Sequence, residues 1–182
     1  MSREDTRARI IDTFRELACT RCLDKITVLD ISEKCGITSQ TFYNHFADKY
    51  ELVNTIHNLR FDEVCDKVNR GEFSWEEGLS DYLKGFSVFS KFIIKAYGNI
   101  GDENSYMQKV ASHMVEKMCS SYEDRTGKSA DEELLFAIRL YADGMLCAIY
   151  KWLKSENRVS EQELAKFIHI AIPRIVVEKF TE

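Results

Sequence analysis

Helix-start signals recur along this chain of 182 residues, and they constrain its fold more than any other feature. In each signal a Ser, Thr or Asp is followed three residues later by an acidic residue. Such a pair satisfies backbone N–H groups that have no partner at a helix N-terminus. Each pair leads into apolar residues at helical spacing, so the sequence predicts an all-α fold. The six pairs are Ser2/Asp5, Thr27/Asp30, Asp48/Glu51, Ser74/Glu77, Ser129/Glu132 and Ser160/Glu163.

Composition supports this prediction and excludes several protein classes. One proline and eight glycines are too few for an all-β chain built on many tight turns. No apolar run reaches the roughly 18 residues that span a bilayer. The charged N-terminus precedes no apolar segment of a secretory signal. We therefore expect a cytoplasmic protein with no membrane partner.

Net charge is −5, but the acidity is unevenly distributed. Residues 1–50 carry eight basic and eight acidic side chains, so the excess of acid lies in the remainder of the chain. An N-terminal segment without net negative charge is compatible with a local basic face, which phosphate contact requires.

Apolar periodicity places the helices in more detail. A break at 70–72 (Arg-Gly-Glu) is the best boundary candidate, and Pro173 should kink the last helix or weaken one of its turns. In the fourth helix we expect Tyr50, Val53, Ile56 and Val64 to be buried. The expected helices cover residues 3–21, 28–35, 39–45, 49–68, 75–94, 103–122 and 131–154, followed by a final helix with apolar residues from 164 to 176.

Residues 36–49, G-I-T-S-Q-T-F-Y-N-H-F-A-D-K, have the layout of the turn and second helix of a helix-turn-helix. Gly36 fits a tight turn that needs a positive φ. Phe42 and Phe46, four residues apart, can face a core that includes Ile31 and Ile37. The opposite face would then present Ser39, Gln40, Tyr43 and Asn44 to a DNA groove.

At these residues the chain resembles the TetR family of bacterial regulators. The family's Y-x-H-F-x-x-K-x-x-L run is matched from Tyr43 through Leu52, within a similar stretch from Thr6 to Ile56. The resemblance implies an all-α homodimer with a three-helix helix-turn-helix DNA-binding domain over 1–48. A helical effector-binding and dimerisation domain would occupy 49–182.

The resemblance also implies the DNA contacts. Thr27 matches a capping residue that contacts phosphate, as a helix N-terminus favours. Gln40 can pair with adenine through its amide, and Tyr43 matches a position that touches phosphate or a thymine methyl. His45 could equally be a capping or packing residue. The full set of expected DNA contacts is Thr27, Thr38, Ser39, Gln40, Thr41, Tyr43, Asn44, His45 and Lys49.

The last two predicted helices are apolar on more than one face and must therefore be covered on more than one side. We expect them to form a homodimer as a four-helix bundle; the alternative is that they are core helices of a monomer.

The C-terminal part resembles short family members from Firmicutes. One of these is a coactivator of a dihydroxyacetone kinase operon, so the resemblance leaves activation open beside repression.

A pocket for an unidentified small-molecule effector is expected among the helices after Ser74. An effector that favours a dimer with badly spaced reading helices would weaken operator binding. His113 and Asp143 are expected to face the interior and to orient a polar ligand. Aromatic and methionine side chains at helical spacing can equally be plain core. The candidate lining residues are Phe86, Phe89, Tyr97, His113, Met114, Met118, Phe136, Tyr141 and Asp143.

Other functions have less support. We expect the six cysteines to be free thiols in small core positions. A zinc site and a redox sensor are less favoured alternatives. The C-x-x-C at Cys19 and Cys22 has no second pair that could complete a zinc site. No enzyme motif is recognisable, and no cofactor or metal is expected. A helical interaction module without DNA binding is the stronger rival. Salt-dependent duplex affinity would separate it from a DNA-binding regulator.

Overall fold

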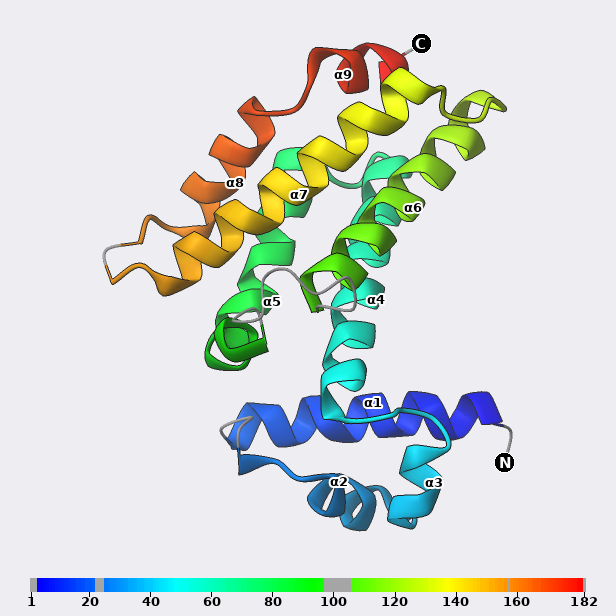
Figure 1. Cartoon of the computed structure of the whole chain (residues 1–182), viewed down its shortest axis with the longest axis vertical. Coiled ribbons are helices and arrows are strands. Elements are labelled where there is room, and N and C mark those ends of the chain that lie inside the picture. The colour runs from blue at the N-terminus through cyan, green and yellow to red at the C-terminus, as the bar shows by residue number, and fades with distance from the viewer. Residues whose placement is uncertain (1–2, 22–24, 97–105, 157, 182) are drawn as a thin grey trace. The chain divides into compact units, whose positions relative to one another are not determined.

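The computed structural model describes residues 3–21, 25–96, 106–156 and 158–181, apart from the side chains of 87–89, 91–92, 95–96 and 181. All regular structure in these residues is helical, which confirms the all-α prediction (Figure 1). The helices are α1 (Arg3–Thr20), α2 (Val28–Cys35), α3 (Ser39–Tyr43), α4 (Lys49–Asn69), α5 (Trp75–Ala96), α6 (Tyr106–Thr126), α7 (Glu132–Lys154), α8 (Glu161–Ile170) and α9 (Arg174–Thr181).

The chain separates into two compact units, Met1–Ile56 and His57–Glu182. The first unit holds α1, α2, α3 and the first two turns of α4, and the second holds the rest of α4 and α5–α9. The sequence-based division between residues 48 and 49 falls at the first residue of α4. Helix α4 is thus shared by both units.

In the first unit, α2 packs against both α1 and α3 (Figure 1). The apolar faces of these helices bury Phe14, Ile31, Phe42 and Phe46, as the sequence predicts. Gly36 ends α2 in the left-handed region with φ 68°, which allows the chain to turn directly into α3. The turn fixes where the polar face of α3 points.

Local capping chemistry starts several helices where the sequence predicts. Thr27 and Ser160 form reciprocal capping boxes with the acidic residue three positions later. At α7 the expected pair is wrong. Asp131 accepts from the Leu134 N–H and caps the helix, and Ser129 lies outside it. Asp and Ser cap about equally well, so local chemistry does not decide between them.

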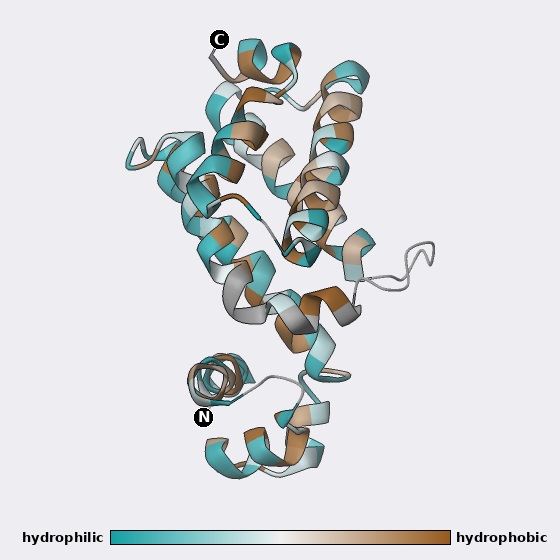
Figure 2. Ribbon diagram, turned by 90° about the vertical axis from the view of Figure 1, so that its left-hand side faces the viewer, coloured by the Kyte–Doolittle hydropathy of each residue, from teal (hydrophilic) through white to brown (hydrophobic). Residues whose placement is uncertain are grey.

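The second unit is a bundle in which α7 contacts α5, α6 and α9, while α8 packs on α5. Its helices carry both apolar and polar stretches (Figure 2), as amphipathic helices do. Pro173 interrupts the last predicted helix instead of kinking it: α8 ends at Ile170 and α9 begins at Arg174. The missing proline N–H and the ring's clash with the preceding turn account for the break.

Three burial predictions fail. Tyr50 is exposed, because Leu52 and Val53 fill the core positions of the first turn of α4. Cys19 and Cys147 are also exposed, whereas Cys35 and Cys65 are buried as expected. The exposed cysteines lie on helix faces turned away from the core of their own unit.

Candidate nucleic-acid interface and cavity

Helix α3 presents polar side chains on one face and anchors itself with the other. Phe42 has no exposed area, whereas the adjacent Tyr43 is 51 % exposed. The two rings meet edge to face with centroids 5.6 Å apart, so the buried ring supports the exposed one. Gln40 on α3 and Asn44, the residue that caps its C-terminal end, are also exposed. The face predicted to read DNA is therefore open to solvent.

Hydrogen bonds hold this face in order. The Gln40 side-chain amide donates to the Asn44 side-chain oxygen at 3.3 Å, one helical turn away. Thr38 caps α3 by accepting from the Thr41 N–H, and the two threonine hydroxyls are 2.9 Å apart. Ser39 is half-buried beside them. Thr38 and Thr41 thus stabilise the start of α3 through each other.

Two of the remaining predicted contacts, Thr27 and Lys49, have hydrogen-bond partners within the first unit. The Lys49 ammonium donates to the Ile26 carbonyl at 3.1 Å and is half-buried. The Thr27 hydroxyl and N–H both donate to Asp30, and these bonds lower the pKa of that carboxyl below its usual value. His45 is half-buried at the end of α3. Contact with phosphate by Lys49 or Thr27 would supplement these bonds or replace some of them.

The structure adds an arginine that the sequence did not single out. Arg3 in α1 donates to the Asn44 carbonyl at 3.3 Å, which brings its guanidinium to the C-terminal end of α3. Arg7 instead stacks over the Phe46 ring at 5.1 Å and donates to Thr55. Helix periodicity could not distinguish these arginines, because the difference depends on which residues after α3 each side chain reaches.

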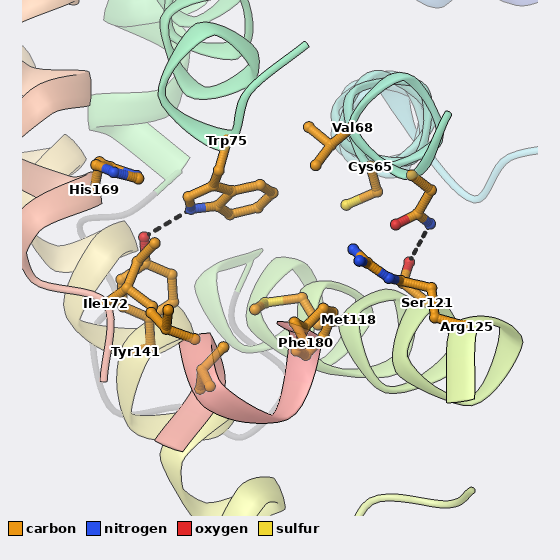
Figure 3. Close-up of a pocket in the computed structure, with 13 residues that line it drawn as sticks. Cys65, Val68, Trp75, Met118, Ser121, Arg125, Tyr141, His169, Ile172 and Phe180 are labelled. Atoms are coloured by element: carbon orange, nitrogen blue, oxygen red, sulfur yellow. Dashed lines mark hydrogen bonds between the residues drawn. The ribbon is translucent and has the colours of Figure 1, made fainter. Parts of the chain in front are cut away.

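A cavity of about 250 Å³ lies in the second unit (Figure 3). The Trp75 indole donates to the Tyr141 hydroxyl at 3.0 Å, and that hydroxyl donates to the Ile168 carbonyl at 3.1 Å. Asn69 donates to the Ser121 hydroxyl at 3.0 Å. Most of the wall is apolar, formed by side chains from α4, α6 and the segment around α9: Val68, Met118, Ile172, Val176, Val177 and Phe180.

Two of the nine predicted pocket residues, Met118 and Tyr141, line this cavity. Phe86 and Met114 are buried in the core outside it. His113 is half-buried but faces α4, where it pairs with Asp62 at 2.7 Å.

The remaining pocket candidates do not line this cavity or fall outside what is described. Phe136 is 68 % exposed on α7, and Asp143 is exposed and lines a separate hollow with Arg139 and residues of α6. Tyr97 and the Phe89 side chain lie outside the described residues. Periodicity did not reveal Trp75 or Arg125 as lining residues, because their meeting depends on the packing of separate helices.

Helices α7 and α8 expose large apolar side chains that their own unit does not cover. Phe136 and Leu140 lie one turn apart on α7, and Phe167 and Ile170 lie one turn apart on α8. All four are more than half exposed. Exposed apolar residues clustered in this way are typical of a surface that contacts another molecule.

Comparison with known proteins identifies the family. Residues 10–56 match the model described as "Bacterial regulatory proteins, tetR family", and residues 74–174, more than half of the chain, match "Transcriptional regulator C-terminal region". The chain belongs to the TetR family. It is a helix-turn-helix transcriptional regulator, in a family of regulators and not of enzymes.

Two curated relatives extend the comparison. The chain is 31 % identical over 94 residues to the HTH-type transcriptional regulator AlkX of Mycobacterium tuberculosis, covering 48 % of this chain and 42 % of AlkX. It thus spans less than half of that relative's length. It is 22 % identical over 173 residues to DhaS, the HTH-type dhaKLM operon transcriptional activator of Lactococcus lactis, covering 94 % of this chain and 91 % of DhaS.

Solved structures share the fold. A TetR transcriptional regulator from Rhodococcus sp. RHA1 superposes with a TM-score of 0.71 at 19 % identity, covering 96 % of this chain and 98 % of that one. The Thermus thermophilus repressor FadR in complex with lauroyl-CoA gives 0.63 at 15 % identity, covering 95 % and 94 %. Each of these structures matches nearly the whole chain, so the likeness in fold includes the first and the second unit.

Two further features bear on function. None of the described helices is long and apolar enough to cross a membrane. Among the described residues, no cluster of three or more His, Cys, Asp or Glu side chains is arranged to hold a metal ion.

Proposed function

We propose that the protein acts as a homodimer on an approximately palindromic operator, with α3 of each protomer in the major groove. The exposed polar face of α3 above a fully buried Phe42 carries this proposal. Gln40, Tyr43 and Asn44 are the base-reading candidates, and Thr38, Ser39 and Thr41 form the leading turn. Thr27, His45 and Lys49 contact the DNA backbone, and Arg3 joins them at the end of α3.

The dimer forms through α7 and α8, which each expose two large apolar side chains one turn apart. A two-fold axis places the same surface of each protomer in one interface, so a stripe on one copy meets its counterpart. The two reading helices then sit about 34 Å apart, one turn of DNA, which sets the spacing of the half-sites, and the two-fold symmetry of the dimer requires a nearly palindromic operator. Because the partner is chromosomal DNA, we place the protein in the cytoplasm.

We further propose that an effector bound in the cavity of the second unit weakens operator binding, which makes the protein a ligand-responsive repressor. The cavity and the continuity of α4 between the units support this role. A second candidate is activation, favoured by similarity to the activator DhaS along 94 % of the chain. Transcript levels of neighbouring genes in a deletion strain distinguish the two, rising for a repressor and falling for an activator.

Footprinting on the DNA that flanks the protein's own gene tests the proposal. The expected result is a protected site with two similar half-sites, bound with a stoichiometry of one dimer. A duplex with one half-site scrambled should bind much more weakly than the intact site. Equal affinity for both duplexes would refute the dimeric mode of reading, and no protected site at any promoter would refute operator binding.

A further inference from the structure

The cavity of the second unit has walls that carry almost no charge. Burial raises the pKa of the Cys65 thiol to about 12 and that of the Tyr141 phenol to about 12, so both groups are neutral at physiological pH. The Tyr141 hydroxyl is already bonded to Trp75 and to the Ile168 carbonyl. A ligand in this part of the cavity would meet hydrocarbon, sulfur and aromatic rings.

Arg125 breaks this pattern at one end of the cavity. It lines the cavity from the last turn of α6, beside the Asn69–Ser121 hydrogen bond, and its side chain extends toward Cys65 and Met118 (Figure 3). Arg125 is exposed, so its guanidinium is also in contact with solvent. None of the described residues that line the cavity is acidic, and within the described part of the chain Arg125 forms no ion pair. A guanidinium in this setting suits a carboxylate, which it can bind through two parallel hydrogen bonds.

The volume limits the length of the ligand. An engineered apolar cavity of about 150 Å³ in another protein holds benzene, with six carbons. Scaled by volume from that case, about 250 Å³ has room for roughly ten carbon atoms.

We propose that this cavity binds a medium-chain carboxylate, with the hydrocarbon chain against the apolar wall and the carboxylate on Arg125. The inference rests on the function proposed above, since it names the chemical class of the effector. His169, exposed on α8, is the other lining residue able to carry positive charge. We assign the carboxylate to Arg125 and not to His169 because Arg125 lies beside Asn69 and Ser121. These two polar side chains can donate further hydrogen bonds to the carboxylate.

Calorimetric titration of the full chain with three probes that share a ten-carbon chain tests the inference: decanoate, decanol and decyltrimethylammonium. The two ionic probes are used below their micelle concentrations and decanol below its solubility limit. Decanoate should bind at one molecule per chain, decanol more weakly, and the cation not measurably. Arg125→Gln should lower decanoate affinity at least about tenfold, the effect of losing a charge-assisted hydrogen bond, and leave decanol within about twofold. Lys109→Gln, on the exposed face of α6 and outside the cavity lining, is the control and should leave decanoate affinity unchanged, whereas His169→Gln should lower that affinity less than Arg125→Gln does.

Three results would overturn the inference: no saturable binding of decanoate, equal affinity for decanoate and decanol, or a loss caused by His169→Gln and not by Arg125→Gln. Operator affinity of the same preparations without ligand keeps the two proposals separate. Intact operator binding without decanoate binding overturns only this inference. Loss of operator binding beside normal decanoate titration overturns only the proposed function.

Discussion

Replacing Phe136 by lysine tests the proposed dimer surface on α7. The side chain is 68 % exposed in the single chain, so most of its area is available to be buried by a partner. Burying a whole phenylalanine side chain contributes about 1.5–3 kcal/mol, and the exposed two-thirds therefore about 1–2 kcal/mol. A two-fold interface contains two copies, which gives about 2–4 kcal/mol per dimer. The dissociation constant should rise at least about thirtyfold, before any cost of desolvating lysine.

Sedimentation velocity over a range of protein concentrations measures this change directly. Within each chain the substitution should cost no more than about 0.5 kcal/mol, because it replaces an exposed side chain, and helix content by circular dichroism should be unchanged. Leu59→Lys is the matched control: Leu59 is 42 % exposed on α4, and the substitution changes charge and polarity in the same way. A Phe136→Lys variant that dimerises as tightly as the unmodified chain would refute the assignment of the interface to α7.

Three further predictions concern stability. Phe42→Ala removes a side chain with no exposed area and should cost about 3–5 kcal/mol in urea unfolding, whereas Tyr43→Ala should cost far less; equal losses would contradict the orientation of α3. Gly36→Ala places a side chain at φ 68° and should cost about 1 kcal/mol; an unchanged free energy of unfolding would contradict the left-handed turn after α2. Burial lowers the pKa of His57 from 6.5 to about 3, so below about pH 6.5 the unfolded chain binds a proton that the folded chain does not. Stability should therefore fall as pH decreases from 6.5, and His57→Gln should flatten that slope; an unchanged slope would show that His57 is protonated in the fold.

Features that depend on local chemistry could be predicted from the sequence. The bounds of α2, the capping boxes at Thr27 and Ser160, and the left-handed turn at Gly36 each involve residues within four positions of one another. The burial of Phe42 and Phe46 follows from a four-residue spacing within a short polar helix. The first unit is accordingly the part of the fold that the sequence predicts best.

Features that depend on packing between helices could not be predicted. Helix α7 is apolar on several faces, so periodicity groups its residues without saying which face turns inward. The sequence predicts Phe136 in a pocket and Asp143 in the interior, and the structure exposes both. The cavity brings together Trp75, Tyr141 and Arg125 from three helices. The spacing of these residues along the chain does not predict that they line one cavity.

The central claim is that the exposed face of α3 reads an operator, and one measurement tests it most directly. Fluorescence anisotropy measures the affinity for the footprinted operator duplex at increasing salt concentrations. It compares the unmodified chain with Tyr43→Ala and with a control, Tyr50→Ala. Tyr50 is also an exposed tyrosine of the first unit, but it lies outside α3. The account predicts affinity that falls steeply with salt. It also predicts a loss of at least about tenfold for Tyr43→Ala with little change in thermal unfolding, and a much smaller loss for Tyr50→Ala. Undiminished operator affinity in Tyr43→Ala would contradict it.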